Sequence, residues 1–171
     1  MDFTTLKKSH NRKTFDCGHP AVNDYLATKA RRHQELNVGL TQVMLHPDSP
    51  NHVIAFYTLA IKQVACEVLP GSLPNYPHNE VPVILLGWMG IDQRIQGRGN
   101  GMKTLLYALT HALNIMESAD GIGVGVIIDA IDGNAMEWYQ NMDTFEVIDN
   151  EARRLFVSLK SLREYRKQGL I

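Results

Sequence analysis

Residues 83–116 read VILLGWMGIDQRIQGRGNGMKTLLYALTHALNIM, and this stretch decides the fold. Residues 83–91 form a continuous apolar run, which is typical of a strand buried on both faces of a sheet. Residues 102–116 place their apolar side chains on one helical stripe, and the glycine-rich segment 96–101 connects the two. A buried strand, a tight turn and an amphipathic helix in this order predict a mixed α/β fold with a crossover back to the sheet.

The flanking segments complete this prediction. Upstream, the patterns predict a helix over 20–35, strands over 41–46 and 53–60 with a hairpin loop over 47–51, and an irregular proline-rich loop over 70–82. Residues 61–66 either continue the second strand or bend away from it. Downstream, the patterns predict a strand over 121–130, a short helix over 134–141, and closing strands over 145–149 and 154–159.

Length and composition favour one globular domain over residues 1–171. The chain has 171 residues, of which 44% are hydrophobic and 20% charged, so its core needs no metal or disulfide for stability. No apolar run approaches the ~18 residues of a membrane span, and the N-terminus lacks the pattern of a signal peptide. We therefore expect a cytoplasmic protein with no membrane partner. Cys17, Cys66 and the scattered histidines show no metal-ligand spacing, so we expect no metal.

The charges are unevenly distributed although the net charge is −1. Residues 1–40 carry seven Lys and Arg against four Asp and Glu, residues 41–150 carry four against twelve, and residues 151–171 carry six against two. Basic ends around an acidic middle are a modest sign of a polyanionic partner. The alternative is a solvated surface on which these charges scatter once the chain has folded.

The glycine-rich segment 96–101 reads QGRGNG and predicts an anion site. Glycines let backbone N–H groups approach a ligand closely, and the start of the following helix adds partial positive charge. Two nucleotide motifs do not fit: a P-loop needs glycine where Met102 stands, and the dinucleotide fingerprint lacks its third glycine. The alternative is a strand-to-helix turn without a ligand.

In its order of strand, Gln-x-x-Gly-x-Gly and helix, the segment resembles the acyl-CoA loop of the GNAT superfamily of N-acetyltransferases. Gln96, Gly99 and Gly101 stand at the family's Arg/Gln-x-x-Gly-x-Gly/Ala positions. The resemblance implies a central mixed, splayed β-sheet flanked by helices. It also implies that loop N–H groups hold the diphosphate of acetyl-CoA while the preceding strand pairs with the pantetheine arm. The cofactor-binding residues implied are Met89, Gly90, Ile91, Gln96, Gly97, Arg98, Gly99, Asn100, Gly101, Met102 and Asn134.

Residues 129–139 read DAIDGNAMEWY and match the GNAT stretch that ends a strand and opens a helix facing the cofactor. Acetyl transfer to an amine needs an N–H group for the oxyanion and an acid for the leaving thiolate. A phenol has a pKa close to that of a thiol, so the resemblance makes Tyr139 the general acid. The alternative is a packing tyrosine. No general base is evident, because three nearby carboxylates are typical of surfaces or turns: Asp92, Asp132 and Glu67.

Over about residues 10–160 the chain resembles the GNAT toxins of type II toxin–antitoxin systems. The matching segments are 15–18 (FDCG), 22–26 (VNDYL), 55–59 (AFYTL) and 73–77 (LPNYP). Such toxins acetylate the α-amine of an aminoacyl-tRNA and pair with an antitoxin that has a ribbon-helix-helix DNA-binding part. The resemblance thus implies tRNA and antitoxin as partners, and a homodimer. Basic candidates for tRNA phosphates are Lys29, Arg31, Arg32, Arg98, Arg153 and Arg154.

One departure from the toxins leaves the acceptor open. Trp88 stands where the toxins carry an arginine near the acceptor site. Two alternative functions follow: a non-toxin GNAT N-acetyltransferase for a small-molecule or peptide amine, and a domain that binds acyl-CoA or RNA without turnover. The resemblance over most of the chain favours acetyl transfer from acetyl-CoA to an aminoacyl-tRNA, as a toxin, over both alternatives.

Overall fold

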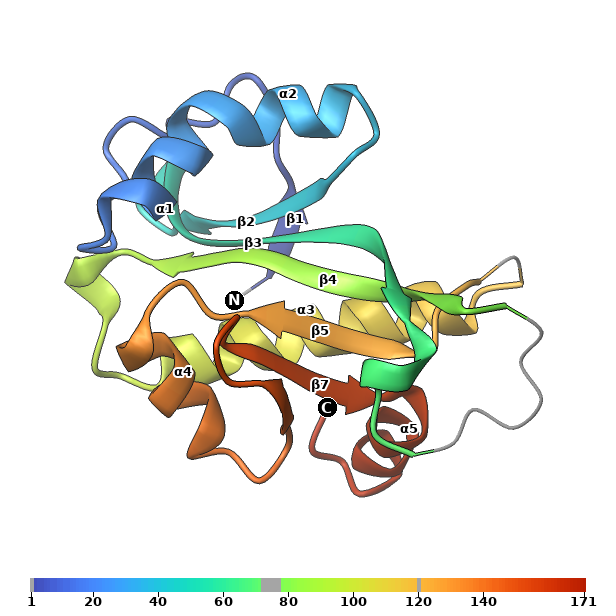
Figure 1. Cartoon of the computed structure of the whole chain (residues 1–171). Coiled ribbons are helices and arrows are strands. Elements are labelled where there is room, and N and C mark those ends of the chain that lie inside the picture. The colour runs from blue at the N-terminus through green and yellow to red at the C-terminus, as the bar shows by residue number, and fades with distance from the viewer. Residues whose placement is uncertain (1, 72–77, 120) are drawn as a thin grey trace. The chain divides into compact units, whose positions relative to one another are not determined.

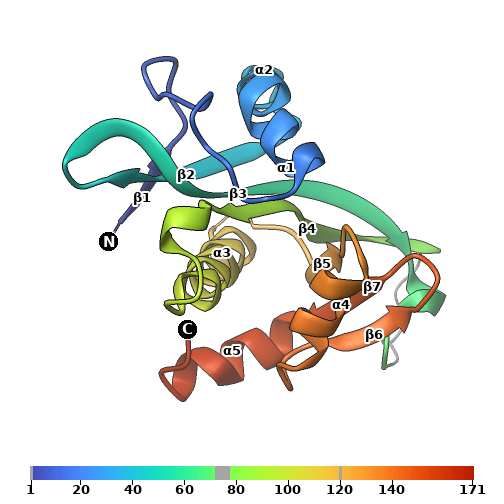
Figure 2. The same cartoon turned by 90° about the vertical axis from the view of Figure 1, so that its left-hand side faces the viewer.

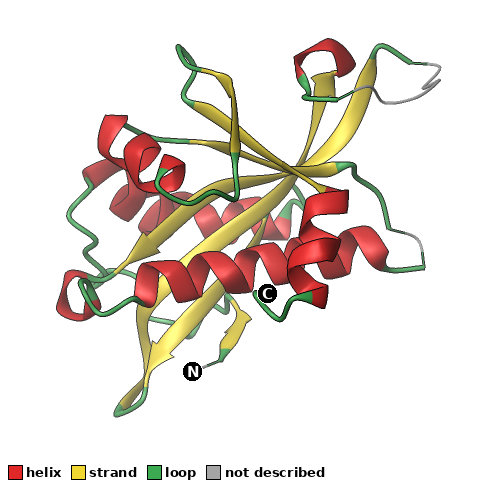
Figure 3. Cartoon of the chain, turned by 90° about the horizontal axis from the view of Figure 1, so that it is seen from below, coloured by secondary structure: helices red, strands yellow, loops and turns green. Residues whose placement is uncertain are grey.

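The computed structural model describes residues 2–71, 78–119 and 121–171. Seven strands form one mixed sheet in the order β1-β2-β3-β4-β5-β7-β6. The helices lie in the connections between the strands and after the last strand (Figure 3). The chain divides into two compact units, each built from two segments: Met1–Ala60 with Gly87–Ala108 (unit 1), and Ile61–Leu86 with Leu109–Ile171 (unit 2).

Antiparallel strands form the sheet of unit 1. β2 (Leu40–His46) and β3 (Ser49–Ala65) make a hairpin whose register places Leu40 opposite Leu59, and β1 (Phe3–Thr5) pairs with the outer side of β2 (Figure 2). β3 crosses into unit 2 at Ile61. Seven consecutive β3 residues from Val53 are buried, as expected for a strand that is covered on both faces of the sheet.

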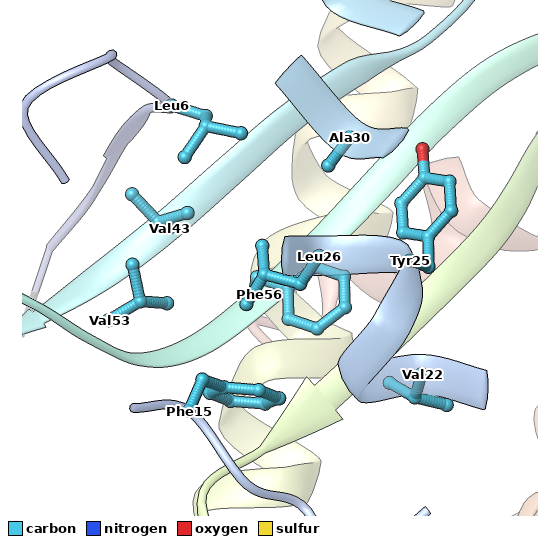
Figure 4. Packing of buried hydrophobic residues seen from close by; sticks show 9 residues of the cluster. All are labelled: Leu6, Phe15, Val22, Tyr25, Leu26, Ala30, Val43, Val53 and Phe56. Atoms are coloured by element: carbon cyan, nitrogen blue, oxygen red, sulfur yellow. The ribbon is translucent and has the colours of Figure 1, made fainter. Parts of the chain in front are cut away.

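A helical segment covers one face of the unit 1 strands (Figure 1). It comprises α1 (Pro20–Asp24), the π-helical turn η1 (Tyr25–Lys29) and α2 (Ala30–Glu35). Proline suits the first turn of α1, where its missing N–H group would have no helical partner. Apolar side chains between helix and sheet form a buried cluster (Figure 4), made of Leu6, Phe15, Val22, Tyr25, Leu26, Ala30, Val43, Val53 and Phe56.

β4 (Glu80–Ile91) enters unit 1 at Gly87 and ends before the glycine-rich segment. The short 3-10 turn η3 (Gln93–Ile95) and then α3 (Asn100–Glu117) follow, and α3 passes into unit 2 at Leu109. In unit 1, the ring of Phe3 contacts Tyr57 of β3 and Tyr107 of α3, with centroids 5.0 and 5.1 Å away. The first half of α3 is therefore joined to the sheet by aromatic contacts.

Unit 2 combines one parallel and two antiparallel pairings. β4 pairs in parallel with β5 (Gly125–Asp129) from Ile84 to Leu86, and β5 pairs antiparallel with β7 (Arg154–Ser158), which pairs with β6 (Glu146–Asp149). The remaining elements are η2 (Cys66–Val68), α4 (Gly133–Gln140) and α5 (Leu159–Lys167). α5 packs on β5 and β7 (Figure 2).

Ion pairs fasten α5 to the second half of α3. Glu117 accepts hydrogen bonds from Arg163 and Arg166, each at 2.8 Å, and Arg166 also donates to Asn114 at 2.7 Å. The basic C-terminal residues that suggested a polyanion footprint thus include two arginines engaged inside unit 2. Surface pairs of this kind each contribute about 0–1 kcal/mol, so they orient α5 more than they stabilise it.

The predicted mixed α/β fold is confirmed, with corrections at several boundaries. Residues 61–65 continue β3, the hairpin loop shrinks because β3 already begins at Ser49, and β4 begins at Glu80 inside the predicted irregular loop. Residues 72–77 of that loop lie outside the described residues. β1 and α5 were not predicted, because three residues are too few for a pattern and the polar composition of α5 conceals its single buried residue, Leu162.

Candidate active site

Asp92 organises the turn between β4 and the glycine-rich segment. Its side chain is 1% exposed and accepts hydrogen bonds from the Arg94 guanidinium at 2.7 and 2.8 Å, and from the Arg94 backbone N–H at 3.1 Å. The backbone N–H of Asp16 donates to Oδ2 of Asp92 at 3.3 Å. Burial by itself would raise the pKa of Asp92, but these hydrogen bonds outweigh it and hold the pKa below its usual value. Asp92 is thus a turn carboxylate, as predicted, but a buried one.

Two side chains of the segment point back into the protein. Gln96 donates from Nε2 to the carbonyl of Ile91 at 2.7 Å and to that of Cys17 at 3.0 Å. Asn100 is buried and donates from Nδ2 to the carbonyl of Ile95 at 2.8 Å. Both residues therefore hold the shape of the loop, and both N–H bonds of the Gln96 amide are already used.

At the start of α3 two glycines of the segment have open space where side chains would stand. Gly97 and Gly99 have φ of +71° and +74°, a conformation that favours glycine, and no atom lies within 4 Å of where a Cβ would be. Alternating left-handed residues turn successive N–H groups to one side and make an anion-binding nest. The exposed side chains of Arg98 and Met102 flank it. This geometry fits a diphosphate held by backbone N–H groups.

The strand before the loop owes its glycine to packing. A Cβ on Gly90 would lie 2.9 Å from Phe56 and 3.0 Å from both Phe15 and Val22, so α1 and β3 leave no room for one. Gly90 and Ile91 are buried and Met89 is half-buried. The side chain of Ile91 thus serves the core of unit 1, and Gly90 offers only its backbone for the predicted contact with pantetheine.

Trp88 lies on Tyr25 in unit 1. The two rings are stacked, with centroids 4.3 Å apart and planes 9° apart, and Phe56 lies 6.4 Å from Tyr25 on a nearly parallel plane. Tyr25 is buried, and burial raises its pKa, although hydrogen bonds with Thr58 and Thr41 oppose this. The ring of Trp88 therefore packs against Tyr25 of η1. It stands at the sequence position where the toxins carry an arginine.

In unit 2, α4 carries the predicted acid. Asp132 caps the helix by accepting from the Ala135 N–H at 2.8 Å, which makes it the turn carboxylate predicted from the sequence. Tyr139 is 6% exposed, and its ring contacts Trp138 and Phe145 edge-on, with centroids 4.9 and 5.9 Å away. Burial raises the pKa of the phenol well above its usual value, so it keeps its proton at neutral pH. Asn134 is exposed in the first turn of α4.

The predicted tRNA contacts differ in how they are engaged. In unit 1, Lys29 pairs with Asp24 at 3.1 Å, Arg31 pairs with Glu35 at 3.0 Å, and Arg32 is exposed. These exposed pairs are weak enough to exchange for phosphate.

In unit 2 the predicted contacts serve the fold as well. Arg153 is exposed but donates to the carbonyl of Ala130 at 3.1 Å. Arg154 is bound through two hydrogen bonds to Asp129, which also pairs with Lys62 at 2.8 Å. Burial would raise the pKa of Asp129, but these two cations lower it. Arg154 is thus a structural residue of the β5–β7 pair.

Comparison with known proteins finds relatives that are named as toxins. No family model matches it. It is 29% identical over 151 residues to the "tRNA-acetylating toxin" of Mycobacterium tuberculosis, covering 88% of this chain and 87% of the relative. It is 28% identical over 121 residues to the "Probable toxin TacT" of Sinorhizobium fredii, covering 70% and 65% of the two chains. The chain resembles the GNAT toxins of type II toxin–antitoxin systems.

Solved structures of bacterial toxins share the fold of this chain. A mutant of KacT superposes with a TM-score of 0.85 at 20% identity, covering 95% of this chain and 97% of KacT. AtaT complexed with acetyl-methionyl-tRNAfMet superposes with a TM-score of 0.83 at 21% identity, covering 96% and 99%. The predicted fold class and family resemblance are therefore confirmed.

The sequence analysis expected neither a metal site nor a membrane-spanning segment. Among the described residues, no group of three or more His, Cys, Asp and Glu side chains is placed to hold a metal ion. In the same part of the chain, none of the helices combines the length and apolar character that crossing a membrane requires. Cys17 and Cys66 are free and half-buried.

Proposed function

We propose that this protein transfers the acetyl group of acetyl-CoA to the α-amine of an aminoacyl-tRNA, acting as the toxin of a toxin–antitoxin pair. The observation that carries the proposal is the pair of left-handed glycines with open space beside them, Gly97 and Gly99, at the start of α3 and at the GNAT motif's position of the acyl-CoA loop. The relative named as a tRNA-acetylating toxin, and AtaT structures with acetyl-CoA and with acetylated tRNA, support the substrates.

In this proposal unit 1 binds the diphosphate of acetyl-CoA. The N–H groups of residues 97–102 donate to its oxygens, and the α3 terminus adds favourable charge. Arg98, whose side chain is exposed beside the nest, adds a positive charge. The side chains of Gln96 and Asn100 hold the loop through hydrogen bonds to backbone carbonyls, and the backbone of Met89–Ile91 holds the pantetheine arm.

Tyr139 is the general acid in unit 2. The amine attacks the thioester carbon, the C–S bond breaks, and the phenol gives its proton to the sulfur as negative charge develops there. The attacking nitrogen releases one proton to water, and a proton from water restores the phenol. Because burial raises the pKa of Tyr139, the phenol is fully protonated before each turnover. Asn134, exposed at the start of α4, is our candidate partner for the pantetheine amide.

The partners follow the same resemblance. An AtaT mutant is seen bound to the C-terminus of the antitoxin AtaR, and KacTA is seen in a complex with DNA. We propose an antitoxin with a ribbon-helix-helix part for this chain, a homodimer as its active form, and the cytoplasm as its place of action. Lys29, Arg31 and Arg32 are the candidate contacts to tRNA phosphates in unit 1.

The stacked Trp88 favours one second candidate, an N-acetyltransferase for a different amine. An aromatic surface in place of a charge changes which acceptor group is recognised. This candidate keeps the loop and Tyr139 in the same roles and differs only in the acceptor.

Tyr139→Phe tests the proposal because it removes one hydroxyl and keeps the ring. With acetyl-CoA and a mixture of charged tRNAs, thiol release by the wild-type protein should exceed that of Tyr139→Phe by about 10²–10⁴-fold. The thermal midpoint should match, which separates loss of chemistry from loss of fold. Expression of the wild-type protein in bacteria should arrest growth, and the variant should not.

A panel of free amines and peptides serves as the control for the acceptor. Faster turnover of a free amine than of charged tRNA would support the second candidate and contradict the toxin. Absence of heat on titration of coenzyme A into the folded protein would contradict both enzymatic functions.

A further inference from the structure

Hydrogen bonds join the glycine-rich segment to a turn far away in the sequence. The turn, residues 15–18, precedes α1 and is hydrogen-bonded within unit 1 to Gln96 of the segment and to two residues just before it, Asp92 and Gln93. The N–H of Gln93 donates to the carbonyl of Asp16 at 2.9 Å, and the N–H of Asp16 donates to Asp92 at 3.3 Å. Gln96 donates from its side chain to the carbonyl of Cys17 at 3.0 Å. Loop and turn thus share one hydrogen-bond network.

Gln96 is the side chain that bridges them. Its Nε2 donates both to the carbonyl of Cys17 and, at 2.7 Å, to the carbonyl of Ile91 at the end of β4. A primary amide has two N–H bonds, so both donors are used and none is left for a phosphate oxygen. Gln96 therefore affects an anion in the loop only through the backbone that it positions, beginning with the adjacent Gly97.

The network continues from the turn into α1. Asp16 accepts from the N–H of Gly18 at 2.8 Å and from Asn23 Nδ2 at 2.7 Å. Asn23 in turn accepts from the N–H of Cys17 at 2.9 Å. The start of α1 is thus hydrogen-bonded to the turn that Gln96 holds, and α1 continues directly into η1, which carries Tyr25.

We propose that Gln96 is a positioning residue that couples occupancy of the glycine-rich loop to the order of the turn 15–18 and the start of α1. The inference rests on the proposed function, because it takes the diphosphate of acetyl-CoA as the ligand of the loop. An anion that draws the N–H groups of the loop together restricts residues 93–97, and the bond from Gln96 passes this restriction to Cys17. Binding of the diphosphate to the loop then stabilises the ordered turn 15–18, and by thermodynamic linkage an ordered turn strengthens the binding.

The two cysteines of the chain provide a reporter and its internal control. Cys17 lies in the turn, with its Sγ 3.2 Å from Asn23 Oδ1, and burial raises the pKa of its thiol. Its alkylation therefore reports opening of the turn. Cys66 is half-buried in unit 2 and bonds to the carbonyl of His78 at 3.3 Å, so it reports opening elsewhere. The chain has only these two cysteines, and mass spectrometry separates them.

The experiment measures iodoacetamide alkylation of both thiols, with and without a saturating thioether analogue of acetyl-CoA, which carries no reactive thiol. In the wild-type protein the analogue should slow alkylation of Cys17 by at least about fivefold and leave Cys66 unchanged. In Gln96→Met, which keeps the length of the side chain but cannot donate, Cys17 should react faster and the analogue should no longer slow it. The KM for acetyl-CoA should rise in this variant more than kcat falls.

Gln96→Arg is the matched control, because arginine occupies this position in the GNAT motif and can donate to the same carbonyls. It should restore both the slow alkylation of Cys17 and the low KM. A purely space-filling role would instead be served as well by methionine.

Three outcomes would overturn the inference. The first is protection of Cys17 by the analogue that persists in Gln96→Met at saturation, since it would show direct shielding. The second is a wild-type protein that binds the analogue with no change at Cys17. The third is hydrogen exchange at Gly18 and Asn23 of the wild-type protein that does not change when the analogue binds. This measurement needs no variant, so it decides the question even if Gln96→Met exposes Cys66 as well and is therefore unfolded. Failure of the proposed function is distinct from all three, because the analogue would then not bind the wild-type protein at all.

Discussion

Asp92→Ala is the most direct test of how the turn after β4 is stabilised. In the wild-type protein the carboxylate of Asp92 is almost fully buried and accepts from two backbone N–H groups and the Arg94 guanidinium. Alanine accepts from none of them. The N–H groups of Asp16 and Arg94 are then left without their acceptor, while the Arg94 side chain, 58% exposed, turns to water.

The expected cost is a loss of about 3 kcal/mol in the free energy of unfolding. Losing the cap at the Arg94 N–H costs about 1 kcal/mol, and the longer bond from the Asp16 N–H costs about as much. The fork to Arg94 adds only about 1 kcal/mol, because this arginine is exposed and solvent screens the pair. Arg94→Ala should cost less than Asp92→Ala, since it leaves both backbone bonds in place.

The pH dependence of this cost has a definite sign. The folded-state pKa of Asp92 lies below its unfolded value, because the hydrogen bonds to the carboxylate outweigh its burial. The stabilisation by Asp92 is therefore fully present above the unfolded pKa of ~3.9 and is lost as pH falls through the folded pKa. The difference between wild type and Asp92→Ala should be constant from pH 7 to ~5 and should shrink below ~4.

Urea unfolding followed by circular dichroism at several pH values measures both effects. Titration of coenzyme A into the same samples should show weaker binding by Asp92→Ala, because the loop loses its anchor. A loss below about 1 kcal/mol at pH 7, or a difference that grows on acidification, would refute our account of the turn.

Further predictions concern the acid, the core and the basic residues. Burial raises the pKa of Tyr139 above the usual tyrosine value of ~10, so the rate of acetyl transfer should not decline through deprotonation of Tyr139 up to pH ~10. A decline with a midpoint near ~9 in the pH–rate profile would contradict this. Gly90→Ala should cost about 1–3 kcal/mol in urea unfolding, since its Cβ would meet three core side chains, and an unchanged midpoint would show that the core yields. Arg154→Ala should destabilise the protein by about 2 kcal/mol through loss of its bonds to Asp129, as thermal unfolding would show. Arg32→Ala should leave the thermal midpoint unchanged and weaken tRNA binding with a smaller salt dependence; equal affinity at all salt concentrations would exclude this contact.

The residues 83–116 by themselves determined the fold class and the place of the glycine-rich loop. A buried strand, a glycine turn and an amphipathic stripe are local patterns, because their periods follow from backbone geometry alone. For the same reason the helices 20–35 and 134–141 could be predicted within a few residues. The polar α5 could not, because a single buried leucine gives no period.

What each site residue does was decided only by tertiary contacts. Sequence matching placed Gln96 and Gly90 with the cofactor, but Gln96 is turned toward the carbonyls of Cys17 and Ile91, and Gly90 is required by the side chains of α1 and β3. The sequence likewise could not tell that Asp92 is buried and that Arg154 is bound. Hydrogen bonds between residues 79 apart in the chain have no local signature, since they exist only once folding has brought their partners together.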